Sequence, residues 1–83
     1  MTASIRFPAV TSKEVVRALE KIGFEFLRQT GSSHAIYKRK SDSKITVVPI
    51  HSGQIIKRKT LKAILKDADL TIERFNELRK GKN

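Results

Sequence analysis

The sequence predicts an α+β domain in which helices pack on one face of a small antiparallel sheet. Two segments, one near the N-terminus and one in the second half, repeat apolar residues at helical spacing. Between them lie three short segments rich in β-branched and aromatic residues, separated by polar turns. These connections are short, so the strands are expected to form an antiparallel meander. The predicted order is helix, three strands, helix and a short C-terminal helix.

The first helix is predicted over residues 12–22. Thr11 and Glu14 have the spacing of a capping box, in which the hydroxyl accepts a backbone N–H bond and the carboxylate reaches back. Apolar residues then recur at helical spacing, and Gly23 is typical of a residue that ends a helix. Residues 1–10 are expected to form a flexible leader.

Three strands are predicted after this helix. Phe24 and Phe26 alternate with a charged residue, which is the pattern of a strand. Turn residues at 30–33 and 40–43 divide the segment. The strands are therefore expected over 24–28, 34–39 and 44–48, with Pro49 ending the last one. The four phenylalanines are interpreted as core or core-edge residues.

Two helices are predicted in the second half. The basic run at 57–59 leads into a helix with an apolar face of Leu61, Ile64, Leu65 and Ala68. Thr71 is a candidate N-cap for a last short helix. The domain is expected to cover residues 11–79, and 80–83 to form a tail.

Charge is the strongest compositional signal. Eighteen Lys and Arg residues oppose eight Asp and Glu residues, a formal net charge of +10 in 83 residues. Such an excess attracts polyanions, so the candidate partners are nucleic acid, an acidic protein or an anionic membrane surface, with solubility alone as the alternative. No apolar run approaches the roughly 20 residues of a membrane span. The chain has no cysteine, which excludes disulfides and thiolate chemistry and fits a reducing cytoplasm.

His34 is the first candidate for chemistry. It follows the turn Gly31-Ser32-Ser33, whose backbone N–H groups suit a phosphate. An imidazole titrates near neutral pH and can transfer a proton during phosphodiester cleavage. The alternative is a surface histidine or one with a structural hydrogen bond.

Other residues could assist. Arg28 and Lys38 are candidates to hold the phosphate. His51 is a candidate second proton-transfer group, or a histidine that only positions its loop. Tyr37 either stacks on a base or packs on the sheet. No carboxylate lies at ligand spacing from either histidine, so no metal and no cofactor are expected.

Two basic runs flank these candidates, at 38–40 and 57–59. They could bind an RNA backbone or be a solvated face. Lys57, Arg58 and Lys59 stand at a predicted helix N-terminus, which the helix dipole disfavours unless an anion binds there.

Four segments in order resemble the HicA (YcfA-like) toxin family. The run from Thr11 to the pair Gly23-Phe24 is similar to the family's first helix. Residues 28–37 resemble its Arg-x-x-Gly-Ser-His motif, with one additional serine, and Val48-Pro49-Ile50-His51 resembles its Val-Pro-x-His motif. Residues 59–68 are similar to its Thr-Leu-x-x-Ile-Leu helix, with Lys59 where the family often has glycine.

The resemblance implies a fold similar to double-stranded RNA-binding domains and a cytoplasmic messenger RNA interferase that arrests translation. The family's catalytic histidine corresponds to His34. A HicB-type antitoxin would neutralise the toxin by covering that site.

We therefore expect a metal-independent endoribonuclease that uses the RNA's own 2′-hydroxyl as nucleophile. The RNA backbone is expected to contact Arg28, Gly31, Ser32, Ser33, Lys38, Lys57, Arg58 and Lys59. The alternatives are a non-catalytic RNA-binding module of the same fold and a module that docks an acidic protein.

Overall fold

The α+β fold is confirmed by the computed structural model, which describes residues 7–31, 33–51 and 53–80. The elements are α1 (Ser12–Lys21), β1 (Phe24–Thr30), β2 (His34–Arg39), β3 (Lys44–Pro49), α2 (Arg58–Asp67) and α3 (Ile72–Lys80). In this part of the chain, no helix is long and apolar enough to cross a membrane.

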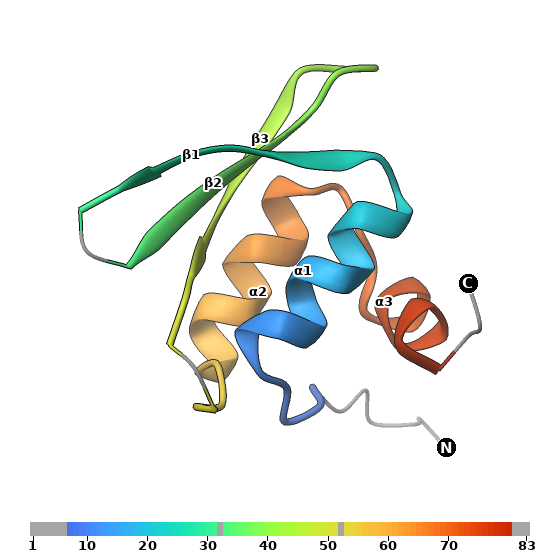
Figure 1. Cartoon of the computed structure of the whole chain (residues 1–83). Helices are drawn as coiled ribbons and strands as arrows, with labels where there is room; N and C mark the ends of the chain where they lie inside the picture. Colours follow the sequence, from blue (N-terminus) through green and yellow to red (C-terminus); the bar gives the residue numbers. More distant parts are fainter. Residues whose placement is uncertain (1–6, 32, 52, 81–83) are drawn as a thin grey trace.

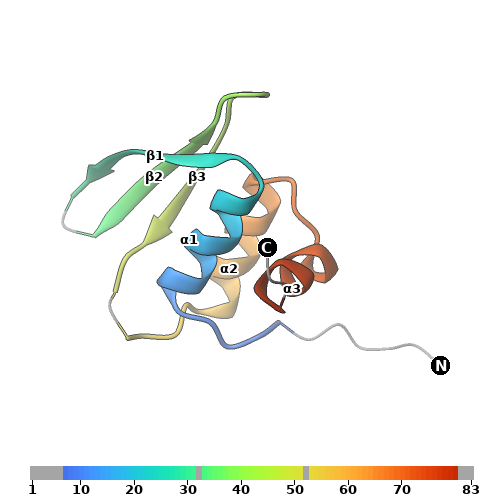
Figure 2. The ribbon, with the colours of Figure 1, turned by 45° about the vertical axis from the view of Figure 1, so that its right-hand side comes forward.

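The three strands form one antiparallel sheet with β2 in the centre. Helices α1 and α2 lie side by side against one face of this sheet, and α3 packs against α1 farther from the strands (Figures 1 and 2). No described helix covers the other face. The turn between β1 and β2 projects beyond the helices in both views.

Local signals set the ends of α1 as the sequence predicts. The Thr11 hydroxyl accepts a hydrogen bond from the Glu14 backbone N–H, and a Glu14 carboxylate oxygen accepts one from the Thr11 N–H at 2.9 Å. These two bonds complete the predicted capping box. Gly23 follows the helix with φ of +97°, a left-handed conformation that glycine adopts without strain.

The core lies between the sheet and the two covering helices and continues between α1 and α3. Along β2, Ala35 and Tyr37 are buried while His34 is exposed. Along β3, Thr46 and Val48 are buried in the same alternation. The largest fully buried side chains are those of Phe24, Phe75, Leu19, Leu61, Ile64, Val10, Val15, Val48 and Thr46. Side chains on a strand alternate between its faces, so this pattern assigns the residues of β2 and β3 to a side.

Several details differ from the sequence predictions. Strand β3 includes Pro49, and α3 includes Lys80 of the predicted tail. Phe26, predicted as core or core-edge, is 56% exposed because it lies on the edge strand β1, where its ring makes a T-shaped contact with the Tyr37 ring. Val10, placed in the leader, is fully buried, and its carbonyl accepts a hydrogen bond from the Ile56 N–H at 2.8 Å. Strand β1 extends to Thr30 because Thr30 pairs with His34. Residues 1–6 of the predicted leader lie outside the described residues.

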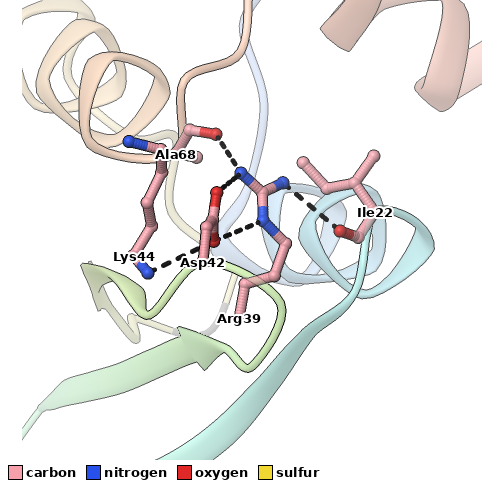
Figure 3. Close-up of polar contacts among 5 residues, drawn as sticks. All are labelled: Ile22, Arg39, Asp42, Lys44 and Ala68. Carbon is pink, nitrogen blue, oxygen red and sulfur yellow. Dashed lines mark hydrogen bonds and ion pairs between the residues drawn. The ribbon is translucent and has the colours of Figure 1, made fainter.

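The guanidinium of Arg39 joins the sheet to the ends of both covering helices (Figure 3). It donates hydrogen bonds to the carbonyl of Ile22 at the end of α1 and to that of Ala68 at the end of α2. Its other contacts are with the Asp42 carboxylate, at 2.9 and 3.1 Å, and with the Phe24 ring, 4.7 Å from the ring centroid. The hydrogen bond from Arg39 lowers the pKa of the Asp42 carboxyl.

Replacing Arg39 should destabilise the whole domain. Arg39→Ala removes hydrogen bonds to two helix ends and the cation above Phe24, so we expect the free energy of unfolding to fall by about 2–3 kcal/mol. Urea denaturation followed by circular dichroism measures this. Lys40→Ala, the adjacent exposed cation, is the control and should change stability by less than about 0.5 kcal/mol. Equal stabilities for the two variants would contradict this role of Arg39.

Candidate functional site

His34 stands at the start of the central strand, with a neighbouring strand on each side. It pairs with Thr30 of β1 and with Pro49 of β3. Beyond this pair, the Ile50 N–H donates a hydrogen bond to the Ser33 carbonyl at 2.7 Å. The backbone that carries His34 is therefore held on both sides, while its side chain is exposed on the sheet face opposite the helices.

The turn before His34 is shaped by a glycine. Gly31 has φ of +62°, and a Cβ built on it would lie 4.0 Å from Nδ1 of the His34 imidazole. Ser33 is half-buried, and Ser32 lies outside the described residues. The turn thus brings backbone close to the ring nitrogen of the candidate catalytic residue.

Arg28 and Lys38 lie on the same sheet face as His34. Arg28 pairs with Ile36, two residues along β2, so it is a diagonal neighbour of His34 at a Cα separation of about 7–8 Å. Lys38 is four residues from His34, or about 13 Å along the strand, and pairs with Glu25. Arg28 can share one phosphate with His34, whereas Lys38 can reach only a more distant one.

Apolar side chains occupy the middle of this face. Ile36 pairs with Val47, and Lys38 pairs with Ile45. Ile45 is 48% exposed and Val47 is 40% exposed. The helix-free face therefore combines an apolar centre with His34 and basic side chains around it.

Tyr37 lies on the other side of the sheet. It is buried against the helices, and its ring meets the Phe26 ring edge-on at 5.8 Å between centroids. Burial raises the pKa of its hydroxyl, and the charge of Glu20 adds to the effect. Tyr37 thus packs in the core and is not available to stack on RNA beside His34.

The remaining candidates gather around the first turn of α2. Lys57 is its N-cap, with no side-chain hydrogen bond to the helix end and no acidic residue in the first turn. Arg58 lies over the Phe7 ring, with its guanidinium carbon 5.3 Å from the ring centroid, and Lys59 is exposed. His51 is exposed in the loop that leads to this helix.

His51 and Lys57 line one cavity of about 350 Å³, together with Pro49, residues 54–56 and Thr60. Gln54 and the cavity itself were not predicted from the sequence, because the cavity forms only when the loop folds against α2. The structure therefore brings the candidates together in two groups, His34 with Arg28 on the sheet and His51 with Lys57 beside α2. Pro49 belongs to both, as cross-strand partner of His34 and as cavity wall.

Within residues 7–31, 33–51 and 53–80, no group of three or more His, Asp or Glu side chains is arranged to hold a metal ion. The polar contacts that this region offers a phosphodiester are therefore an imidazole, cationic side chains and backbone N–H groups.

Comparison with known proteins identifies the family. A family model described as the HicA toxin of bacterial toxin-antitoxin systems matches residues 12–70. The comparison with curated proteins gives no match. The matched region extends from the first residue of α1 to the end of the loop after α2, so it includes the whole sheet and both residue groups described above. Because the match covers well over half of the chain, the protein belongs to the HicA toxin family of bacterial toxin–antitoxin systems.

Proposed function

We propose that this toxin is a metal-independent endoribonuclease, a messenger RNA interferase, and that His34 is its catalytic residue. One observation supports this most directly. His34 is an exposed imidazole on a backbone fixed by two neighbouring strands, with a glycine turn beside Nδ1 and Arg28 diagonal to it. A fixed backbone and an exposed imidazole suit a group that must meet a substrate in one orientation.

The proposed reaction needs only RNA and two proton transfers. The 2′-oxygen attacks the adjacent phosphorus, the bond from phosphorus to the 5′-oxygen breaks, and the 2′-proton leaves while the 5′-oxygen gains a proton. The products are a 2′,3′-cyclic phosphate and a 5′-hydroxyl. His34 transfers one of these protons, as base or as acid, and His51 or water transfers the other.

The basic side chains would hold the RNA by its phosphates. Arg28 lies close enough to His34 to bind the scissile phosphate, where it would stabilise the charge that develops in the transition state. Lys38 would bind a neighbouring phosphate along the sheet, and Lys57, Arg58 and Lys59 others near α2. Gly31 and Ser33, on the two sides of the turn, would add backbone N–H groups.

The first test compares the parent protein with His34→Ala on a long single-stranded RNA in EDTA. We expect the parent to cleave and the variant to lose at least about 100-fold in rate, the usual contribution of a general acid or base. Ser41→Ala, in the turn at the opposite end of the sheet, is the control and should cleave like the parent. Circular dichroism should be the same for all three proteins.

Two outcomes of this test would overturn the proposal. Equal cleavage by the parent and His34→Ala would assign the activity to another site or to a contaminant. RNA binding by both proteins without cleavage by either would identify a non-catalytic RNA-binding module.

The nucleophile can be tested with the substrate alone. An RNA that carries a single 2′-deoxynucleotide at a mapped cut site should resist cleavage at that site and be cut normally elsewhere, because the attacking oxygen is missing only there. Gel analysis with end-labelled strands measures this. A cut at the deoxy position, or cleavage of the matching DNA, would contradict attack by the 2′-hydroxyl.

The partner in this proposal is a HicB-type antitoxin with an acidic surface. The net charge of +10 favours such a partner, and Ile45 and Val47 supply an exposed apolar centre for it to cover. We expect the antitoxin to lie across the helix-free sheet face and to shield His34 from RNA.

Hydrogen exchange of the toxin alone and in complex with its antitoxin tests this arrangement. An antitoxin that covers the site reduces the access of solvent to His34. We therefore expect the His34 imidazole to exchange its C2 proton more slowly in the complex. His51, on the loop, serves as the internal comparison. Unchanged exchange at His34 in a fully inhibited complex would contradict inhibition by covering.

A further inference from the structure

Most of the wall of the cavity between the end of β3, the following loop and the first turn of α2 has no part in the proposed cleavage at His34. Its volume of about 350 Å³ lies within the range of sites that bind small molecules, which begins near 300 Å³. Of its lining residues, only His51 and Lys57 have a place in the proposed cleavage.

The cavity walls combine apolar surface with hydrogen-bonding groups. Pro49, Ile55 and Ile56 are apolar, and Gln54 and Thr60 present an amide and a hydroxyl. Neither of these two side chains forms a hydrogen bond with another residue that the structure describes. An amide donates and accepts in one plane, as the edge of a nucleobase does. Apolar walls beside such groups fit a planar heteroaromatic ring better than a bare phosphate.

The cavity lies next to His34 in the fold. Pro49 forms part of the wall and is the cross-strand partner of His34, at a Cα separation of about 4.5–5.5 Å. A nucleotide next to a phosphate bound at His34 is therefore within reach of the cavity.

Positive charge at the cavity mouth favours the phosphate of that nucleotide. Lys57 lines the cavity and is the N-cap of α2, a helix whose first turn contains no acidic residue. Its ammonium group and the helix N-terminus favour the phosphate that accompanies the base. The His51 ring, also in the wall, provides a surface on which a base can stack.

We propose that this cavity binds one unpaired nucleobase of the RNA, next to the phosphate that His34 cleaves. The inference rests on the proposed function and adds to it a source of base preference, because contacts to base edges carry sequence information whereas phosphate contacts do not. It also implies that the substrate is single-stranded at this position, since a paired base cannot enter the cavity. In this role Gln54 and Thr60 read the base and His51 stacks on it, so that water makes the second proton transfer.

The binding test uses His34→Ala, so that no cleavage occurs, and the four nucleoside 3′-monophosphates as probes. We expect at least one nucleotide to shift the NMR signals of Gln54, including its side-chain amide, and of Thr60. The added substitutions Gln54→Ala and Thr60→Val should weaken that binding by about tenfold, as expected for the loss of two hydrogen bonds. Ribose 5-phosphate and inorganic phosphate are the comparison probes.

Two results of the binding test would overturn the inference. The first is the absence of any nucleotide-dependent shift at Gln54 and Thr60. The second is an equal shift with inorganic phosphate, which would make the cavity an anion site without base recognition.

The cleavage test uses an otherwise wild-type protein and a pool of RNAs with random sequence. The parent should show a base preference at one position beside the cut, and Gln54→Ala/Thr60→Val should lose this preference while it still cleaves. The single variant Gln54→Ala should show a partial loss, which keeps the test valid if the double variant is unstable. Lys62→Ala, on the exposed side of α2 and outside the cavity, should keep the preference of the parent.

The two proposals can fail separately. An unchanged base preference in the double variant would overturn the base cavity while the ribonuclease proposal stands. Nucleotide binding in the cavity, lost in the double variant, would support the base cavity even if the parent cleaved no RNA, a result that would overturn the ribonuclease proposal.

Discussion

The rest of the structure depends on the contacts of Arg39. Arg39 is the last residue of the central strand. Its guanidinium donates hydrogen bonds to a carbonyl at the end of α1 and to one at the end of α2. It also binds the Asp42 carboxylate in the turn that follows the strand. Arg39 pairs with Phe24 on one side and with Lys44 on the other. The pairing with β3 keeps one register along the whole of β2, from Arg39–Lys44 to His34–Pro49. The pairing with β1 shifts by one residue between Phe26 and Arg28, and this shift places Thr30 opposite His34. Slippage by one residue would turn His34 toward the helices.

This arrangement leaves one sheet face for function. Because α1 and α2 both lie on the other side, the helix-free face carries His34, Arg28 and the exposed Ile45 and Val47 without a described helix over them (Figures 1 and 2). A toxin of this family has to meet both a target and an antitoxin. A face with an apolar centre and basic surroundings can serve both, since it attracts a polyanion and also offers surface for a protein to bury.

Local sequence signals predicted much of the fold. The Thr11–Glu14 box and the turn residues around β2 each act through neighbours in the chain, so the start of α1 and both ends of β2 agree with the structure. Signals that depend on distant partners were harder to interpret. Val10 is buried because Ile56 comes to lie beside it, and Phe26 is exposed because β1 is an edge strand.

For the candidate site too, the features set by neighbouring residues could be predicted from the sequence, and those set by contacts between distant segments could not. The sequence made His34 and the basic residues candidates, but it left open which face Tyr37 takes, and only the packing of β2 against the helices decides that. The cavity at Gln54 and Thr60 arises from the folding of a loop onto α2, and no periodicity in the sequence describes such a contact.

The central claim is that one imidazole, on the open face of this sheet, transfers a proton during RNA cleavage. Chemical rescue tests this most directly: His34→Gly removes the ring and leaves space for an added imidazole. The account predicts that His34→Gly binds RNA but does not cleave it in EDTA, and that free imidazole restores cleavage at the cut sites of the parent protein. Cleavage by His34→Gly at the parent rate without imidazole, or no rescue although RNA binding is intact, would contradict it.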